Sequence, residues 1–153
     1  MPNSNSFVVS EPSTPEDFET YYHLRYEVLR KPWGHAPGSE KDETDSSSIH
    51  AFIKLNGKAV AISRMHFIDE HTAQIRYMGV DPGYQGKGLG KLVIKYLEGK
   101  AIEHKRKIMV LHARENAVEF YKSCGYTVKE TSYLLWGQIP HWLMEKNLEK
   151  NGR

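Results

Sequence analysis

The chain has 153 residues, of which 39% are hydrophobic and 26% charged, as in an ordinary globular protein with one hydrophobic core. Lys and Arg (21) nearly balance Asp and Glu (19), giving a net charge of +2, which argues against a nucleic-acid-binding surface. The single cysteine, Cys124, excludes an internal disulfide and fits a reducing compartment. The N-terminal residues lack the features of a signal peptide, and no segment has transmembrane length, so we expect a soluble cytoplasmic protein.

The first expected elements are a short strand at residues 6–10 and an amphipathic helix. Thr14 is a good N-cap, Pro15 suits the first helical position, and the apolar pattern continues to about residue 30. Arg25 falls on the apolar stripe of this helix. For Arg25 we favour a structural ion pair over a substrate contact.

Residues 31–48 form a long irregular segment rich in Pro, Gly, Ser and acidic residues. Long loops inside a domain are usually functional or mobile. We therefore expect this segment to lie over a substrate site and to become ordered when substrate binds.

The middle of the chain predicts an antiparallel meander of three strands, at residues 49–55, 58–68 and 72–80. The dipeptide Asn56-Gly57 between the first two is a strong signal for a two-residue hairpin turn.

The second half alternates helices and strands. A helix is expected at 88–104, a buried strand at 107–113, a short helix, and closing strands at 127–135 and about 140–146. In the short helix, Asn116 and Glu119 have the spacing of a capping box, and Gly125 is placed to end it. This order indicates an α+β domain with one parallel crossover.

Three glycines, Gly86, Gly88 and Gly90, stand between a predicted strand and a predicted helix. Glycine lets the main chain approach a ligand closely, and a helix start offers unpaired N–H groups to a phosphate. A P-loop is excluded because Gln85 replaces its first glycine and Leu92 its hydroxyl residue. A dinucleotide fingerprint is excluded by the glycine spacing and by the antiparallel strands that precede it.

What remains is the pattern Gln85-x-x-Gly88-x-Gly90, which resembles the pyrophosphate-binding motif Q/R-x-x-G-x-G/A of the GNAT superfamily of N-acetyltransferases. Residues 111–126 resemble a later motif of that superfamily, A-x-x-F-Y-x-x-x-G-F/Y. Its positions are filled by Ala117, Phe120, Tyr121, Gly125 and Tyr126.

A finer resemblance is to a small bacterial subgroup of predicted acyltransferases. Its members carry an early VLR, an acidic loop, a strand like AQIR, and a final IPH followed by Met. Here these are residues 28–30, 40–45, 73–76 and 139–141 with Met144.

The resemblance implies a GNAT fold, with a mixed, mostly antiparallel central sheet of about seven strands flanked by helices. The sheet would be splayed between its fourth and fifth strands, and residues 1–153 would form a single N-acetyltransferase domain. The implied co-substrate is acetyl-CoA, held without a metal by its pyrophosphate at the helix start and by its pantetheine along the splayed strand. The implied contacts are Met78, Val80, Gln85, Gly86, Lys87, Gly88, Leu89, Gly90, Asn116 and Tyr121.

Direct attack by an amine needs an acid for the departing thiolate and a base for the amine proton. Tyr121 holds the position at which this superfamily often places the acid, and the alternative is a core tyrosine with a satisfied hydroxyl. His141 borders the acceptor side in the last strands and is the base that we name, while His112 beside the pantetheine strand stays open. Acidic residues of the long segment are further candidates: Glu40, Asp42, Glu43 and Asp45. For Arg76, binding of an acceptor carboxylate and a structural ion pair are both open.

The sequence therefore predicts an acetyl-CoA-dependent N-acetyltransferase acting on a primary amine of a small molecule or protein. The alternative is a non-catalytic acyl-CoA-binding sensor on the same fold. The eight histidines show no metal-ligand spacing of the H-E-x-x-H kind, so no metal is expected, and neither a nucleic acid nor a membrane is expected as a partner. A homodimer is common in the superfamily, but the oligomeric state, the acceptor and the preferred acyl chain stay open.

Overall fold

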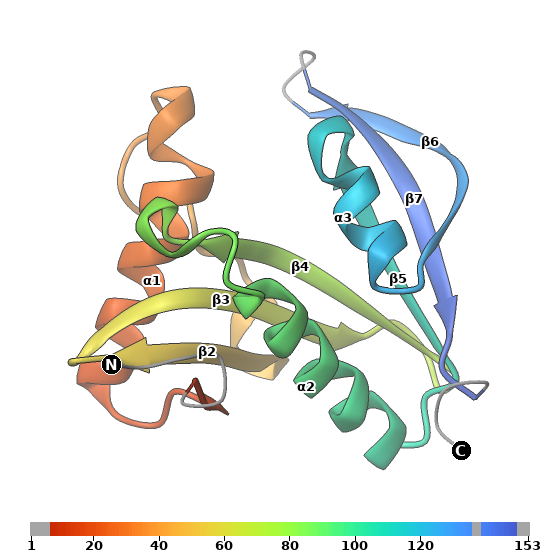
Figure 1. The fold of residues 1–153 in the computed structure, drawn as a ribbon, viewed down its shortest axis with the longest axis horizontal. Coiled ribbons are helices and arrows are strands. Elements are labelled where there is room, and N and C mark those ends of the chain that lie inside the picture. Colours follow the sequence, from red (N-terminus) through yellow and green to blue (C-terminus); the bar gives the residue numbers. More distant parts are fainter. Residues whose placement is uncertain (1–6, 136–138, 150–153) are drawn as a thin grey trace. The chain divides into compact units, whose positions relative to one another are not determined.

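The structure is a computed structural model that describes residues 7–135 and 139–149 (Figure 1). Its sheet has seven strands in the order β1-β2-β3-β4-β5-β7-β6. The strands are β1 (Val9–Ser10), β2 (Ile49–Leu55), β3 (Lys58–Phe67), β4 (Thr72–Val80), β5 (Ile108–Arg114), β6 (Thr127–Leu135) and β7 (Ile139–Asn147). The helices are α1 (Pro15–Leu29), α2 (Leu89–Glu103) and α3 (Val118–Ser123), with short 3₁₀ turns η2 (Lys31–Trp33), η3 (Asp45–Ser47), η4 (Pro82–Tyr84) and η5 (Glu115–Ala117).

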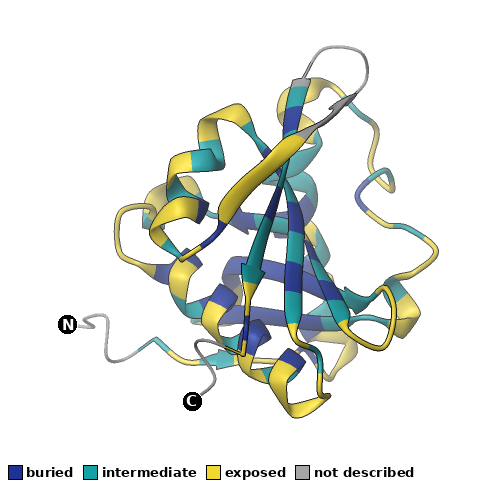
Figure 2. Ribbon diagram, turned by 90° about the vertical axis from the view of Figure 1, so that its right-hand side faces the viewer, coloured by how far each residue is buried: buried dark blue, intermediate teal, exposed yellow. Residues whose placement is uncertain are grey.

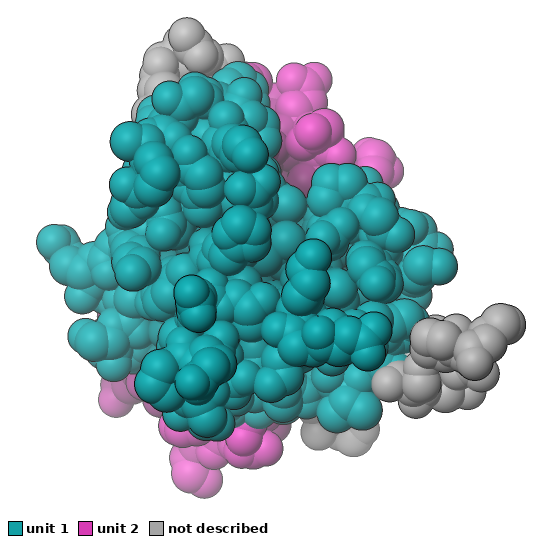
Figure 3. Space-filling view, turned by 90° about the vertical axis from the view of Figure 1, so that its left-hand side faces the viewer, with its two compact units in different colours: residues 1–66, 77–97 teal, residues 67–76, 98–153 magenta. Residues whose placement is uncertain are grey.

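The chain divides into two compact units, coloured separately in Figure 3. Unit 1 comprises residues 1–66 and 77–97, and unit 2 comprises residues 67–76 and 98–153. The polypeptide passes between the units near the end of β3, inside β4 and inside α2.

Unit 1 is built on the β2–β3 hairpin. Its antiparallel register runs from Ile49 opposite Met65 to Leu55 opposite Lys58. The predicted turn is confirmed: Asn56 and Gly57 have φ values of 52° and 80°, the left-handed pair that a two-residue hairpin favours.

Helix α1 begins as its sequence predicts, because the Thr14 side chain accepts a hydrogen bond from the Asp17 N–H at 3.0 Å. Its buried face contributes Tyr21 and Leu24 to a cluster with Phe52 and Ile62 of the hairpin. In Figure 1, α1 lies behind β2 and β3, and the first turns of α2 lie in front of them.

Unit 2 contains the parallel pair. β4 and β5 are in register from Thr72 opposite Ile108 to Ile75 opposite Leu111, and the ladder ends there. β5 pairs with β7 and β7 with β6, both antiparallel. Residues along β5 alternate between buried and intermediate, an alternation visible along the strands in Figure 2. The expected mixed seven-stranded sheet is confirmed, and the parallel ladder between its fourth and fifth strands, where the splay was expected, ends at Ile75 and Leu111.

The expected capping box at Asn116 is wrong. Asn116 lies inside the 3₁₀ turn η5, α3 begins only at Val118, and the N-cap residue Ala117 has no side chain able to cap it. The end of α3 is as predicted: Gly125 has a φ of 100° and its N–H donates to the Lys122 carbonyl at 3.0 Å.

Candidate functional site

The glycine-rich connection of unit 1 joins the end of β4 to the start of α2. Gly86 and Gly88 have φ values of 82° and 79°, in the left-handed region that other residues rarely adopt. A Cβ atom built on either glycine would meet nothing within 4 Å. Their backbone conformation therefore explains the glycines, while the space in front of the main chain stays open to a ligand.

The start of α2 has the chemistry of an anion site. The first four N–H groups of a helix have no intrahelical acceptor and carry partial positive charge. The first turn of α2 contains no acidic residue, and Lys87 lies exposed between the two left-handed glycines. Successive N–H groups in such a conformation form a concave anion-binding surface. The residues present thus fit a pyrophosphate group.

Met78 and Val80, the predicted pantetheine contacts, lie on β4 in the same unit. Between them, Gly79 packs against α1 so closely that a Cβ atom would lie 2.5 Å from Val28 Cγ2. Met78 and Val80 flank this close contact on the strand. The requirement for glycine at position 79 was not recognised from the sequence.

Tyr121, the predicted acid, lies on α3 in unit 2 and is 7% exposed. Burial, and after it the neighbouring Cys124, raises the pKa of the phenol, so Tyr121 is protonated at neutral pH and able to donate. Its ring packs against Phe120 and Tyr126, with centroids at 5.0 and 6.0 Å. No hydrogen bond engages its hydroxyl within residues 7–135 and 139–149. The ring is therefore packed as in a core tyrosine, while its hydroxyl has no hydrogen-bond partner in the described part of the chain.

The two histidines that were considered as bases lie on adjacent strands of unit 2. The register places His112 opposite Leu143 and Arg114 opposite His141, so His112 and His141 project from the same face of the sheet. His141 is buried, with 5% exposed. Burial, followed by the charges of His141 and Arg76, lowers the pKa of His112. His112 is therefore neutral at neutral pH, the form that accepts a proton.

The acidic residues of segment 31–48 differ in availability. Burial alone would raise the pKa of Asp42, but hydrogen bonds from Tyr77, Thr44 and Arg64 outweigh it and lower the pKa strongly. The pKa of Asp45 is likewise lowered, because Arg64, the Asp42 N–H and Arg25 outweigh burial. Carboxylates held ionised in this way are poor bases.

Of the other two acidic candidates, Glu40 is buried and accepts a hydrogen bond from the Gly38 N–H at 2.8 Å, whereas Glu43 is exposed.

The structural interpretation of Arg25 is confirmed, because its Nη1 lies 3.1 Å from Asp45 Oδ2. Arg64, its counterpart on β3, was missed by sequence reasoning. The signal was a charged residue in the middle of an apolar strand, since buried charges need partners.

Asn116, expected to contact the cofactor, is exposed in η5.

No helix in the described ranges combines the length and apolarity needed to cross a membrane. In the same ranges no three His, Cys, Asp or Glu side chains are grouped as metal ligands would be.

The comparisons with known proteins agree with the fold. A family model described as "Acetyltransferase (GNAT) family" matches residues 17–126. The uncharacterized N-acetyltransferase YjcF of Bacillus subtilis (strain 168) is 28% identical over 132 residues, which cover 86% of this chain and 94% of YjcF.

Two solved structures share the fold at low sequence identity. Escherichia coli ElaA has a TM-score of 0.77 at 20% identity, covering 92% of this chain and 99% of its own. An aminoglycoside 6'-N-acetyltransferase complexed with coenzyme A has a TM-score of 0.78 at 14% identity, covering 92% and 97%. Since the family model spans more than half of the sequence, the chain belongs to the acetyltransferase (GNAT) family.

Proposed function

We propose that this protein is an acetyl-CoA-dependent N-acetyltransferase that moves an acetyl group to a primary amine of a small molecule or a protein by direct attack. The whole chain would act as one such domain in the cytoplasm. The observation that carries the proposal is the open, left-handed glycine connection at an acid-free helix start. That combination suits the pyrophosphate of acetyl-CoA.

Acetyl-CoA, when bound, supplies an acetyl group activated as a thioester. In this proposal the main-chain N–H groups of residues 85–90 hold the pyrophosphate without a metal. The backbone of Met78 and Val80 pairs with the pantetheine arm as a neighbouring strand would. The exposed side chain of Lys87 adds positive charge beside the phosphates.

Proton transfer is assigned to side chains of unit 2. The Tyr121 hydroxyl donates to the departing sulfur, a role supported by the lack of a hydrogen-bond partner for that hydroxyl in the described residues. His141 is proposed to accept the amine proton, with His112 as the alternative base. The lowered pKa of His112 keeps it ready to accept a proton.

The relatives support an amine acceptor without identifying it. One structural neighbour is named for an aminoglycoside and was solved with coenzyme A. At 14% identity, this likeness supports a shared fold and does not identify the acceptor of this chain.

A screen of primary amines, measured by release of free CoA, tests the reaction. Two isosteric variants, Gly88→Asp and Gly88→Asn, test the cofactor site, because Asp and Asn both tolerate a left-handed backbone and differ in charge. We expect acetyl-CoA to bind wild type and Gly88→Asn, and to bind Gly88→Asp at least about tenfold more weakly, since the carboxylate would face the phosphates. Equal affinity of the two folded variants in calorimetry would contradict the assigned phosphate site. Tight binding by wild type with no turnover of any amine would favour the sensor alternative.

A further inference from the structure

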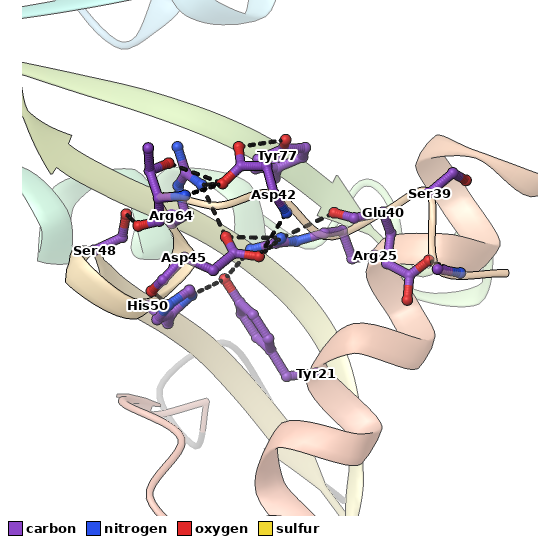
Figure 4. A network of polar contacts seen from close by, with 12 residues as sticks. Tyr21, Arg25, Ser39, Glu40, Asp42, Asp45, Ser48, His50, Arg64 and Tyr77 are labelled. Carbon is purple, nitrogen blue, oxygen red and sulfur yellow. Dashed lines mark hydrogen bonds and ion pairs between the residues drawn. The ribbon is translucent and has the colours of Figure 1, made fainter.

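Two fully buried arginines hold segment 31–48 inside unit 1 (Figure 4). Arg25 of α1 contacts Asp45 at 3.1 Å. Arg64 of β3 contacts Asp42 at 2.7 Å and Asp45 at 2.8 Å. Both guanidinium side chains are 0% exposed, so each depends on these carboxylates for charge compensation. The carboxylates of Asp42 and Asp45 therefore tie the segment to the buried arginines of unit 1.

Tyr77 connects this ion-pair network to β4. Its hydroxyl donates a hydrogen bond to Asp42 Oδ2 at 2.8 Å. The centroid of its ring lies 4.1 Å from Arg25 Cζ and 5.0 Å from Arg64 Cζ. Figure 4 shows Tyr77 beside Asp42 above the two arginines. An aromatic face close to two cations adds cation–π attraction to the hydrogen bond.

The backbone of Tyr77 is unusual for a strand residue. Its φ is 61°, in the left-handed region where a bulky aromatic side chain is a genuine outlier. Such a conformation costs free energy and persists only when surrounding contacts hold it. The contacts that surround Tyr77 include those with Asp42, Arg25 and Arg64.

The left-handed turn at Tyr77 also decides where the next peptide group points. That group carries the Tyr77 carbonyl and the Met78 N–H, and Met78 and Val80 are the residues whose backbone is proposed to pair with pantetheine. A return of Tyr77 to extended φ would rotate these hydrogen-bonding groups away from their present directions.

We propose that Tyr77 is a positioning residue for acetyl-CoA. Its hydroxyl, anchored on Asp42, keeps β4 in the left-handed turn that presents the Met78 peptide group to the pantetheine arm. Segment 31–48 thus acts as a brace for the cofactor strand. The inference rests on the proposed function and adds to it a residue that does not itself carry out the chemistry.

Removing one hydroxyl tests the anchor. Tyr77→Phe keeps the ring against the arginines and loses the hydrogen bond to Asp42. Tyr26→Phe is the matched control: the Tyr26 hydroxyl donates to the His35 carbonyl at 2.8 Å, so it ties the same segment to α1 rather than to β4. We expect the acetyl-CoA dissociation constant of Tyr77→Phe to rise roughly tenfold, with kcat at saturating acetyl-CoA within about threefold of wild type. Tyr26→Phe should bind acetyl-CoA within about twofold of wild type.

A second pair of variants tests the backbone conformation. Tyr77→Ala and Tyr77→Gly lose the same anchor, but only glycine adopts a φ of 61° without strain. Tyr77→Gly should therefore bind acetyl-CoA more tightly than Tyr77→Ala. Thermal melts monitored by circular dichroism establish that each variant is folded.

The outcomes separate this inference from the proposed function. If wild type binds acetyl-CoA and Tyr77→Phe binds it equally well, the positioning role is refuted and the proposed function stands. The role is also refuted if Tyr26→Phe weakens binding as much, or if glycine is no better than alanine at position 77. If wild type does not bind acetyl-CoA, both proposals fail.

Discussion

The buried tyrosines of the two units differ in what engages their hydroxyl groups. In unit 1 the Tyr21 hydroxyl accepts a hydrogen bond from Arg25 Nη2 at 2.9 Å and lies 2.7 Å from His50 Nδ1. His50 Nε2 lies 2.8 Å from the Asp45 carbonyl. Because a carbonyl only accepts, Nε2 carries the proton and Nδ1 accepts from Tyr21. The Tyr21 hydroxyl therefore has a partner on both its acceptor side and its donor side.

In unit 2 two neighbouring tyrosines differ in the same way. The Tyr126 hydroxyl donates to Glu98 at 2.8 Å, and Glu98 also accepts from Lys146 at 2.9 Å. Tyr121, whose ring packs on Tyr126, has no hydroxyl partner in the described residues.

The difference separates structural from chemical use of the same side chain. A hydroxyl already bonded to a buried partner must break that bond before it can transfer a proton, whereas an unengaged hydroxyl keeps its donor for a substrate atom. The polar network of unit 1 is therefore expected to govern stability, and Tyr121 is expected to govern turnover.

The largest expected effect is that of Tyr121→Phe on turnover. General acid catalysis typically contributes about 10²–10⁴-fold, and we expect kcat to fall by about that factor when the hydroxyl is removed. Stability should change little, because no hydrogen bond in the described residues is lost. Steady-state kinetics with the best amine, under conditions where chemistry limits the rate, measure the effect. Unchanged kcat would mean that Tyr121 only fills the core of unit 2.

The next largest effect is expected for Arg64→Met on stability. Removing one member of a buried ion pair leaves an uncompensated charge and costs about 3–5 kcal/mol of unfolding free energy, because Asp42 and Asp45 would lose their shared cation. Lys58→Met, an exposed charge on the same strand, is the control and should change stability by less than about 0.5 kcal/mol. Urea denaturation of both variants measures the two changes in unfolding free energy. Similar small losses in both variants would mean that the network contributes little to stability.

Tyr126→Phe should lower stability and leave turnover nearly unchanged, which is the opposite of the effect expected for Tyr121→Phe. Loss of a buried hydrogen bond to a carboxylate costs about 2 kcal/mol, so the unfolding free energy should fall while kcat stays within about twofold of wild type. The same denaturation and kinetic measurements on both phenylalanine variants give the comparison. A kcat defect in Tyr126→Phe equal to that of Tyr121→Phe would remove the proposed distinction.

The smallest effect concerns pH. Burial is the main cause that lowers the pKa of His50 in the folded protein, and the charges of Arg25 and Arg64 act in the same direction against the attraction of Asp45. The unfolded chain therefore binds a proton more readily, so the stability from neutral His50 is complete above about pH 6.5 and falls as the pH drops below it. The unfolding free energy at pH 7.5 and at pH 5.5 measures this loss. His50→Gln, which has a donor and an acceptor but does not titrate, should show a smaller drop, and an equal drop would assign the effect to other groups.

Segment 31–48 is where the two expectations for unit 1 compete. A lid over the acceptor site would gain protection from hydrogen exchange when both substrates bind. A brace held by Arg25 and Arg64 would protect residues 42–45 to the same extent with and without substrates. The contacts of the two arginines favour the brace, and exchange of these few amides distinguishes the two.

The sequence by itself determined the features that depend on neighbouring residues. Helix α1 begins after the N-cap residue Thr14, and the hairpin turn lies at Asn56-Gly57. Gly86 and Gly88 adopt the left-handed conformation before α2. Each of these residues acts on the backbone within a few positions of itself. The spacing of Asn116 and Glu119 also predicted a local feature, a helix cap. That prediction was wrong, because Asn116 lies inside the 3₁₀ turn η5.

Only the tertiary structure decided which residues meet across the chain. The sequence indicated an ion pair for Arg25, but its partner Asp45 lies 20 residues away in an irregular segment. The sequence did not indicate that the Val28 side chain packs where a Cβ atom of residue 79 would lie. It also did not indicate that Tyr77 would adopt a left-handed φ. These features follow from close packing and from the need of a buried charge for a partner, and both are conditions set by residues distant in sequence.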